Sequence, residues 1–145
     1  MCGIAGIIYR NGGGPHRVGR DMTRMLQSMK HRGPDSTGFA LYRAPTQDLV
    51  VRVKLADSNA PRDLDFADTL RRHRREVEAR IRTAGAHIHS IEDVNEYTVA
   101  VTLSYDGELK RLADHVESVA QAEVLSAGHA LEIVKDLGDA TSENG

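Results

Sequence analysis

Apolar residues recur at helical spacing in three stretches of the chain and form short strand-like runs elsewhere. The helical stretches are residues 18–29, 65–83 and 109–116. The strand runs are residues 3–9, 39–42, 49–55, 86–91, 97–105, 124–127 and 131–135. Helices and strands are thus interspersed without strict alternation, which predicts an α+β fold.

The first strand run, GIAGIIY at residues 3–9, is apolar, β-branched and followed by a glycine-rich turn. This composition predicts a buried strand and then a loop. In the helix that follows, the apolar residues share one face, which predicts that its methionines pack in a core. These apolar residues are Val18, Met22, Met25, Leu26 and Met29.

From residue 49 to residue 127 the predicted elements follow the order strand, helix, strand, strand, helix, strand. This is the ferredoxin-like order βαββαβ, which we place at roughly residues 47–127. Its last strand, at residues 124–127, is expected to pair with residues 131–135 in a hairpin across Gly128-His129.

Composition and charge argue against several classes of function. The chain has 145 residues, enough for one domain with a sizeable insertion, and a formal net charge of −2. A general nucleic-acid binder would be strongly basic, so we expect no nucleic-acid partner. No apolar run approaches the roughly 18 residues of a membrane-spanning helix and no signal-peptide pattern is present, so we expect a cytoplasmic protein without a membrane partner. With a single cysteine and no set of metal ligands beside it, we expect no disulfide, no metal and no other cofactor.

The single cysteine, Cys2, directly follows the initiator methionine. A small second residue normally allows that methionine to be removed, which would make Cys2 the mature N-terminus. Its thiol and α-amine then share one residue, with ordinary pKa values of about 8.5 and about 7.7 to 8.0. The amine is able to accept the thiol proton near neutral pH without a separate histidine base, as in N-terminal nucleophile hydrolases. The alternative is a buried cysteine that packs as a small hydrophobe.

Two motifs surround this chemistry. The chain begins MCGIAGII, and after the first predicted helix residues 31–38 read HRGPDSTG. In this order, and separated by one helix, the two motifs resemble those of the class II glutamine amidotransferases. Residues 97–139 are similar to the stand-alone amidotransferase subunit of glutamate-synthase-like and N-methylglutamate synthase complexes.

The resemblance implies roles for residues of both motifs. Cys2 matches the nucleophile that forms a γ-glutamyl thioester, with its own amine as the proton carrier. Arg32 matches the family's substrate-binding arginine beside the glutamine pocket, and a purely structural role as a hydrogen-bond hub of the turn is equally open. A role in shaping the turn is expected of Gly33, Asp35, Ser36 and Gly38.

The resemblance also implies a function and a fold. Glutamine would be hydrolysed to glutamate, and the ammonia would pass to a synthase partner. The expected architecture is part of an αββα N-terminal nucleophile sandwich interrupted by an inserted ferredoxin-like subdomain. We assign residues 1–46 to the amidotransferase domain with its nucleophile, residues 47–122 to the insertion, and residues 123–145 to a returning strand hairpin and a polar tail.

The sequence departs from the family pattern near its end. After the segment that matches Lys135-Asp136-Leu137-Gly138, the family continues with a Gly-His-Thr-Arg strand and with His-Asn-Gly and Gly-Asp segments. Those segments bind glutamine and form the oxyanion hole, and this sequence does not contain them. We therefore expect the N-terminal part of a longer amidotransferase, weak or inactive alone unless another chain supplies the remaining groups.

Two other classes of function stay open from the sequence. In the first, the βαββαβ unit is a non-catalytic module that binds a partner or a small effector, and the Cys2 segment is vestigial. In the second, the unit is an RNA-recognition domain that uses Tyr97 and Tyr105, although the aromatic pattern of such domains is absent.

Two further features favour ordinary structural roles. His87 and His89 share one side of a predicted strand but have no third metal ligand, which favours surface or core histidines. The basic run at residues 71–75 lies in a stretch with seven basic and five acidic residues, 62–82, which favours a solvated helix face.

Overall fold

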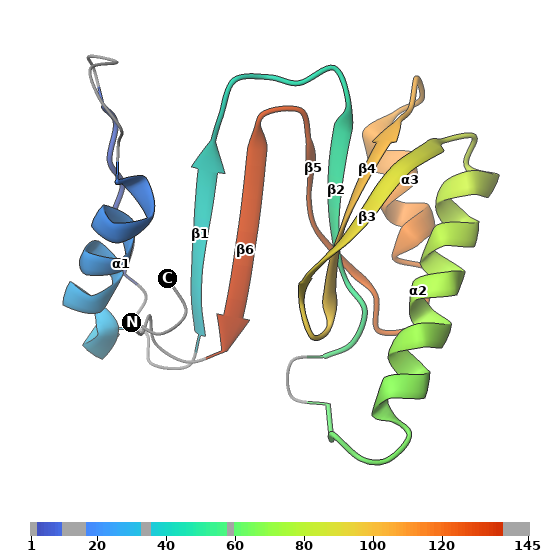
Figure 1. The fold of residues 1–145 in the computed structure, drawn as a ribbon, viewed down its shortest axis with the longest axis horizontal. Helices are drawn as coiled ribbons and strands as arrows, with labels where there is room; N and C mark the ends of the chain where they lie inside the picture. The colour runs from blue at the N-terminus through green and yellow to red at the C-terminus, as the bar shows by residue number, and fades with distance from the viewer. Residues whose placement is uncertain (1–2, 10–16, 33–35, 58–59, 138–145) are drawn as a thin grey trace. The chain divides into compact units, whose positions relative to one another are not determined.

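A computed structural model describes residues 3–9, 17–32, 36–57 and 60–137. The chain divides into two compact units, Met1–Phe39 with Lys135–Gly145 and Ala40–Val134. Helices and two antiparallel sheets are present (Figure 1), so the predicted α+β class is confirmed. In chain order the elements are α1 Val18–Ser28, η1 Lys30–Arg32, β1 Ser36–Tyr42, β2 Leu49–Lys54, α2 Phe66–Thr83, β3 His87–Asn95, β4 Thr98–Ser104, α3 Leu109–Val116, β5 Glu123–Gly128 and β6 Leu131–Leu137.

In the first unit, α1 forms where the apolar periodicity predicts a helix. Asp21 lies in its first turn, where a negative charge is stabilised by the helix dipole. No residue of α1 is buried, and Met22 and Met25 are only half-buried. The prediction that these methionines pack in a core is therefore wrong for the described structure.

Residues 3–9 form an extended segment and not the predicted buried strand. No described strand pairs with the segment, and Ile4 and Ile8 are 96% and 90% exposed. The run has the composition of a strand, but burial also requires hydrogen-bonded neighbours and a second apolar layer.

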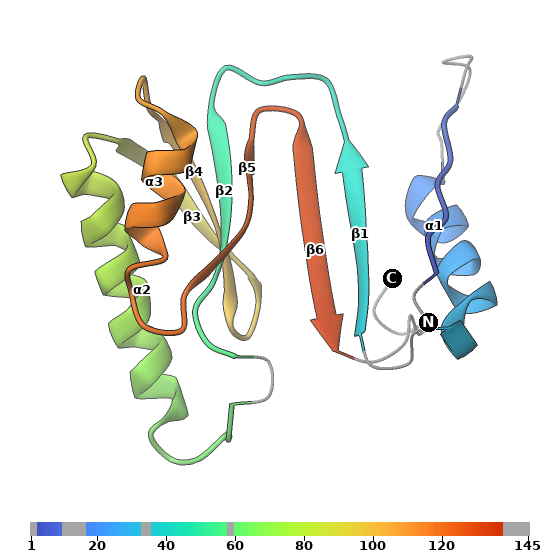
Figure 2. The same cartoon turned by 180° about the vertical axis from the view of Figure 1, so that it is seen from behind.

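The second unit contains a four-stranded sheet with the spatial order β3-β4-β2-β5. All neighbouring strands are antiparallel, and Val51 of β2 lies opposite Val101 of β4 and Ala127 of β5. α2 connects β2 to β3 and α3 connects β4 to β5, and both helices lie on one face of the sheet (Figure 2). Each helix and strand predicted between residues 49 and 127 is therefore present.

Alternate residues of the central strands point toward these two helices and form the core. Only one face of the sheet is buried, so apolar residues recur every second position in the strands. Only one stripe of each helix is buried, so they recur about every 3.6 positions in the helices. Fully burying a valine, leucine or isoleucine side chain stabilises the fold by about 1.5 to 3 kcal/mol. The most deeply buried core residues are Leu49, Val51, Val53, Val77, Ile81, Val101, Leu103, Leu112 and Val116, all of the second unit.

Gly85 determines the end of α2. Its φ is +90°, in the left-handed region that glycine adopts at little cost. The Gly85 N–H donates to the Arg82 carbonyl at 3.0 Å, and the Ala86 N–H donates to the Ile81 carbonyl at 3.2 Å. These two hydrogen bonds form a Schellman motif, and the helix stop predicted at Ala84-Gly85 is confirmed.

β5 and β6 do not form the predicted hairpin. β5 pairs with β2, and β6 pairs with β1 in a separate two-stranded sheet. A two-residue hairpin turn requires a positive φ angle, and among the described residues only Gly85 and Gln121 have one. The prediction of a strand hairpin across Gly128-His129 is therefore wrong.

Backbone hydrogen bonds instead continue the pairing past the ends of β2 and β5. The Arg43 N–H donates to the Ala130 carbonyl at 2.9 Å, and the Thr46 N–H donates to the His129 carbonyl at 2.9 Å. The chain from β1 to β2 thus runs beside the chain from β5 to β6, and the division between the two units falls within β1 and β6.

Candidate functional site

The two sequence motifs meet at Gly3. A Cβ built on Gly3 would lie 3.2 Å from Met29 Sδ and 3.5 Å from Arg32 Cβ. Gly3 is bonded to Cys2, and Arg32 is the second residue of HRGPDSTG. The residue after the predicted nucleophile therefore packs against the predicted substrate-binding arginine.

The turn that follows α1 determines where Arg32 lies. The Met29 N–H donates to the Leu26 carbonyl at 2.9 Å, and the Arg32 N–H donates to the Met29 carbonyl at 2.8 Å. These bonds wind Lys30–Arg32 into a single 3₁₀ turn. A 3₁₀ turn has three residues, so Arg32 comes to lie one turn beyond Met29 on the same side of the chain. Both residues therefore lie next to Gly3.

The Arg32 side chain is exposed, and within the described part of the chain it has no hydrogen-bond or ion-pair partner. A guanidinium carries five N–H donors and no acceptor. The exposed group is therefore able to bind a carboxylate or an amide oxygen of a ligand.

The other predicted site residues are described to different extents. Cys2, Gly33 and Asp35 lie outside the described residues. Ser36 is the first residue of β1, and Gly38 lies within the same strand at an exposed position. The last three residues of HRGPDSTG therefore form the start of β1.

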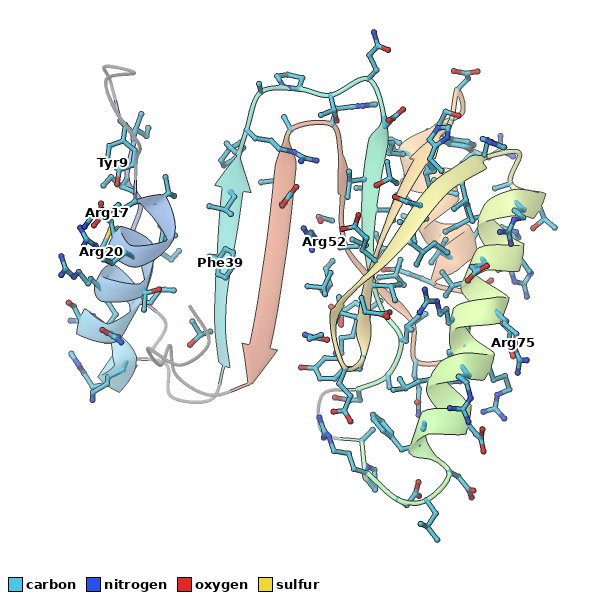
Figure 3. The ribbon with its side chains drawn as sticks, viewed as in Figure 1. Tyr9, Arg17, Arg20, Phe39, Arg52 and Arg75 are labelled. Carbon is cyan, nitrogen blue, oxygen red and sulfur yellow. The ribbon has the colours of Figure 1, made fainter. Side chains whose placement is uncertain are left out.

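A second contact holds the far end of the extended segment against α1, and sequence reasoning did not predict it. The Tyr9 hydroxyl donates a hydrogen bond to Asp21 Oδ2 at 2.6 Å, and Figure 3 shows Tyr9 beside the helix. This bond to a carboxylate raises the pKa of Tyr9 above its ordinary value. The residues of the segment that contact the helical region, Gly3 and Tyr9, are both at odd positions, and the highly exposed Ile4 and Ile8 are at even ones.

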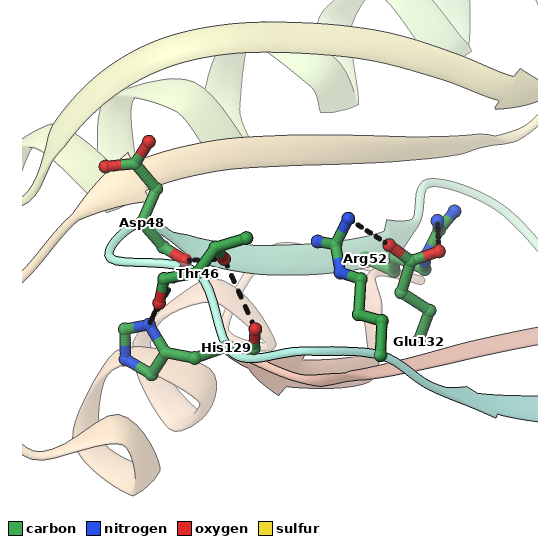
Figure 4. Close-up of polar contacts among 6 residues, drawn as sticks. Thr46, Asp48, Arg52, His129 and Glu132 are labelled. Atoms are coloured by element: carbon green, nitrogen blue, oxygen red, sulfur yellow. Dashed lines mark hydrogen bonds and ion pairs between the residues drawn. The ribbon is translucent and has the colours of Figure 1, made fainter. Parts of the chain in front are cut away.

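Glu132 joins β6 to β2 in the second unit (Figure 4). Its carboxylate lies 2.9 Å from Arg52 Nη2 and 3.0 Å from Arg43 Nη1. Glu132 therefore bridges two arginines that precede and follow the bend between β1 and β2. No local sequence signal predicts this cluster.

His129 stabilises the same bend from its other side. Its Nδ1 lies 3.1 Å from the carbonyl oxygens of both Thr46 and Asp48. A carbonyl oxygen only accepts hydrogen bonds, so Nδ1 carries the proton and Nε2 has the free lone pair when the ring is neutral. This arrangement fixes the ring and positions the bend without assembling a reactive group.

The histidine pair on β3 does not form a metal centre in the described structure. His87 and His89 are exposed, with ring centroids 5.1 Å apart, and His89 Nε2 lies 3.7 Å from Asp48 Oδ1. Among the described residues, no three or more His, Cys, Asp or Glu side chains are arranged to hold a metal ion. Nor does any helix in the described ranges have the length and apolar character needed to cross a membrane.

The basic run of α2 is largely paired with acidic side chains. Arg71 forms an ion pair with Asp68, and Arg74 forms one with Asp93 at 2.8 Å. Arg75 points away from the sheet (Figure 3). These positions confirm the predicted solvated face of this helix.

His73 and Tyr97 are buried, which sequence reasoning did not predict. His73 Nδ1 lies 2.7 Å from the Leu55 carbonyl oxygen, so that nitrogen carries the proton. Tyr97 is 4% exposed and packs with Ala56 and Phe66. A buried ring cannot stack on a base, so the RNA-recognition alternative loses one of its two aromatic side chains.

Comparison with known proteins gives two relatives. Over 143 residues, or 95% of this chain, the sequence is 36% identical to the "Putative glutamine amidotransferase" of Methanothermobacter thermautotrophicus. Over 143 residues it is 32% identical to the "Glutamine amidotransferase-like protein GlxB" of Rhizobium meliloti. This chain is a homologue of proteins named as glutamine amidotransferases. The predicted resemblance to glutamine amidotransferases is therefore confirmed.

The homology covers only part of these amidotransferase relatives. The chain spans 44% of the Methanothermobacter protein and 42% of GlxB, less than half of each. No family model and no solved structure matches the chain.

Proposed function

We propose that this amidotransferase homologue hydrolyses glutamine to glutamate and ammonia with Cys2 as the nucleophile. The contact of Gly3 with Arg32 carries the proposal. Gly3 is bonded to Cys2, and the contact holds Gly3 beside the turn that bears an exposed guanidinium. The names of the two relatives support the same reaction.

The proposed reaction uses the thiol and the amine of one residue. The amine accepts the thiol proton, and the sulfur attacks the side-chain amide carbon of glutamine. The carbon–nitrogen bond breaks, the amine returns the proton to the departing nitrogen, and ammonia leaves a γ-glutamyl thioester. Water then attacks the thioester and releases glutamate and the free thiol. In the proposed site the Arg32 guanidinium lies next to the bound glutamine. Its positive charge also favours the thiolate form of Cys2.

In the proposed architecture, the first unit is part of an αββα sandwich and residues 47–122 belong to an inserted ferredoxin-like subdomain. The extended segment at residues 3–9 supports the proposed sandwich. Its Tyr9 hydrogen-bonds to α1, while Ile4 and Ile8 are exposed and available to a second apolar layer. The spatial order β3-β4-β2-β5, with α2 and α3 as connections, supports the proposed ferredoxin-like insertion.

The ammonia is proposed to pass to a synthase subunit. The inserted subdomain at residues 47–122 is proposed to bind that subunit. Charge asymmetry supports this, because residues 1–60 carry nine basic and four acidic side chains and residues 106–145 carry three and nine. Deletion of residues 49–128 tests it, since the Asp48 carbonyl lies only 3.1 Å from His129 Nδ1 and the cut ends are therefore close. Loss of complex formation is expected, and an intact complex would remove the docking role.

A second candidate function is a non-catalytic binding module, favoured by the position of the buried core. The core residues lie between Leu49 and Val119, within the second unit. This function needs no free α-amine, whereas catalysis does. Mass spectrometry of the mature protein separates the two, because a retained Met1 would block the amine.

The direct test of the proposed reaction is glutamate release from glutamine by the full gene product. A Cys2→Ser variant changes one atom and is expected to lower kcat by at least about 1,000-fold. The unfolding midpoint of the variant should match that of the wild type, which shows that the fold is intact. A serine variant that keeps its activity would exclude the proposed nucleophile.

A further inference from the structure

The Met29 side chain occupies the space in front of Gly3. The 3.2 Å between its Sδ and a Cβ built on Gly3 is shorter than an ordinary van der Waals contact, whereas its Cβ would lie 3.5 Å away. Nothing lies within 4 Å of a Cβ built on Gly6 in the same extended segment. Of the two glycines in the segment, only Gly3, which follows Cys2 in the sequence, is closely packed.

Met29 is also joined to Arg32 through the backbone. Its carbonyl accepts the Arg32 N–H at 2.8 Å, and its own N–H donates to the Leu26 carbonyl at 2.9 Å. One residue thus contacts Gly3 with its side chain and fixes Arg32 with its main chain. Because Met29 is only half-buried and α1 has no buried residue, this contact is not part of a hydrophobic core.

We infer that Met29 is a positioning residue, whose thioether fixes Gly3, the residue bonded to the proposed nucleophile Cys2, beside Arg32. The inference rests on the proposed function for the reaction that it serves. A methionine side chain suits this task because it is unbranched and adapts to the surface that it packs against. A misplacement of about 1 Å in a reacting group costs on the order of 100-fold in rate, so a small shift of Gly3 is measurable.

Substitutions at Met29 and Gly3 in the full gene product test the positioning role. Met29→Ala removes the thioether and is expected to lower kcat about 10- to 100-fold while KM stays within about twofold. Met29→Leu nearly conserves volume and is expected to keep kcat within about threefold of wild type. Met22→Ala is the matched control, because it shortens another half-buried methionine seven positions earlier.

The double variant tests the contact itself. Gly3→Ala adds a methyl group against Met29 Sδ and lowers kcat, whereas Gly6→Ala adds the same group to open space. In the double variant Gly3→Ala/Met29→Ala the added methyl group no longer meets a thioether. The fold-decrease in kcat of the double variant should therefore be smaller than the product of the two single fold-decreases. Losses that simply multiply would overturn the inference.

Alkylation of Cys2 by iodoacetamide gives a readout that does not depend on glutamine. The chain contains one cysteine, so the added mass reports on Cys2 alone. The pH of half-maximal labelling is expected to rise in Met29→Ala and to stay unchanged in Met22→Ala, with similar unfolding midpoints.

An unchanged kcat together with an unchanged labelling profile in Met29→Ala would overturn the inference. If the wild-type protein releases no glutamate but its labelling profile still moves in Met29→Ala, the proposed function fails and the positioning role of Met29 is supported.

Discussion

The Glu132 carboxylate lies 2.9 Å from the Arg52 guanidinium, although 80 positions separate the two residues. The side chains are only 12% and 20% exposed for Arg52 and Glu132, so water screens the pair weakly. Arg52 Nε is buried and has no hydrogen-bond partner in the described structure. The carboxylate is therefore the main compensation for a largely buried positive charge.

Glu132→Gln is expected to lower the free energy of unfolding by about 1.5 to 3 kcal/mol, because it leaves the Arg52 guanidinium without its charged acceptor. Glu76→Gln on α2 is the matched control. Its ion pair with Arg72 is longer, at 4.0 Å, and the Arg72 side chain is 61% exposed. The free energy of unfolding is therefore expected to change by no more than about 0.5 kcal/mol. Urea unfolding measures both, and equal effects would contradict the compensating role of Glu132.

Gly85→Ala and Gly128→Ala are expected to change stability in different ways. Gly85 has a φ of +90°, which costs alanine about 1 to 2 kcal/mol. Gly128 lies in β5 without a positive φ, and a Cβ there would meet the Leu131 backbone at an ordinary 4.0 Å. Gly128→Ala should therefore be neutral or stabilising by up to about 1 kcal/mol. A loss of stability that is equal in the two variants would contradict the Schellman motif.

Tyr9 is expected to ionise above the ordinary tyrosine pKa of 10.0, because its neutral hydroxyl donates to the Asp21 carboxylate. Since the folded pKa is the higher one, the bond contributes fully below about pH 10 and is lost as the pH rises through the raised pKa. Tyrosinate absorbance of the wild type, compared with Tyr9→Phe, isolates this titration. Asp21→Asn should return it toward the ordinary value, and an unchanged titration would exclude the bond.

Arg32→Ala is expected to lower kcat/KM for glutamine by about 10- to 1,000-fold with little change in the unfolding midpoint, because its exposed side chain has no partner among the described residues. Arg32→Lys should recover part of the loss, since lysine keeps the charge but not the planar donor fork. A structural hub of the turn would give the opposite result, namely a lower unfolding midpoint and an unchanged kcat/KM.

Local periodicity was sufficient to predict the elements of the second unit. The helical spacing of Phe66, Val77 and Ile81 predicts α2, because one stripe of that helix faces the core. The same stripe contains His73, four positions before Val77, and this spacing was the available signal for its burial. Because arginines flank His73 on both sides, the whole run 71–75 is assigned from its sequence to the solvated face.

Strand pairing and the contacts of the site depend on interactions between distant residues. The hairpin prediction at Gly128-His129 failed because neighbouring strands in sequence often pair, whereas here β5 and β6 each pair with a strand from the first half of the chain. The two motifs predicted that Cys2 and Arg32 belong to one site. The contact of Gly3 with Arg32 depends on the 3₁₀ turn after α1, which no residue pattern specified.

Covalent labelling by a diazoketone analogue of glutamine tests most directly whether Cys2 is the nucleophile. The reagent occupies a glutamine site and alkylates the attacking sulfur, and mass spectrometry of the digested protein locates the adduct. We expect one adduct, on Cys2, that forms in parallel with the loss of glutamate release and is slowed by glutamine. Loss of activity with Cys2 unlabelled, or an adduct on another residue, would contradict the proposed mechanism.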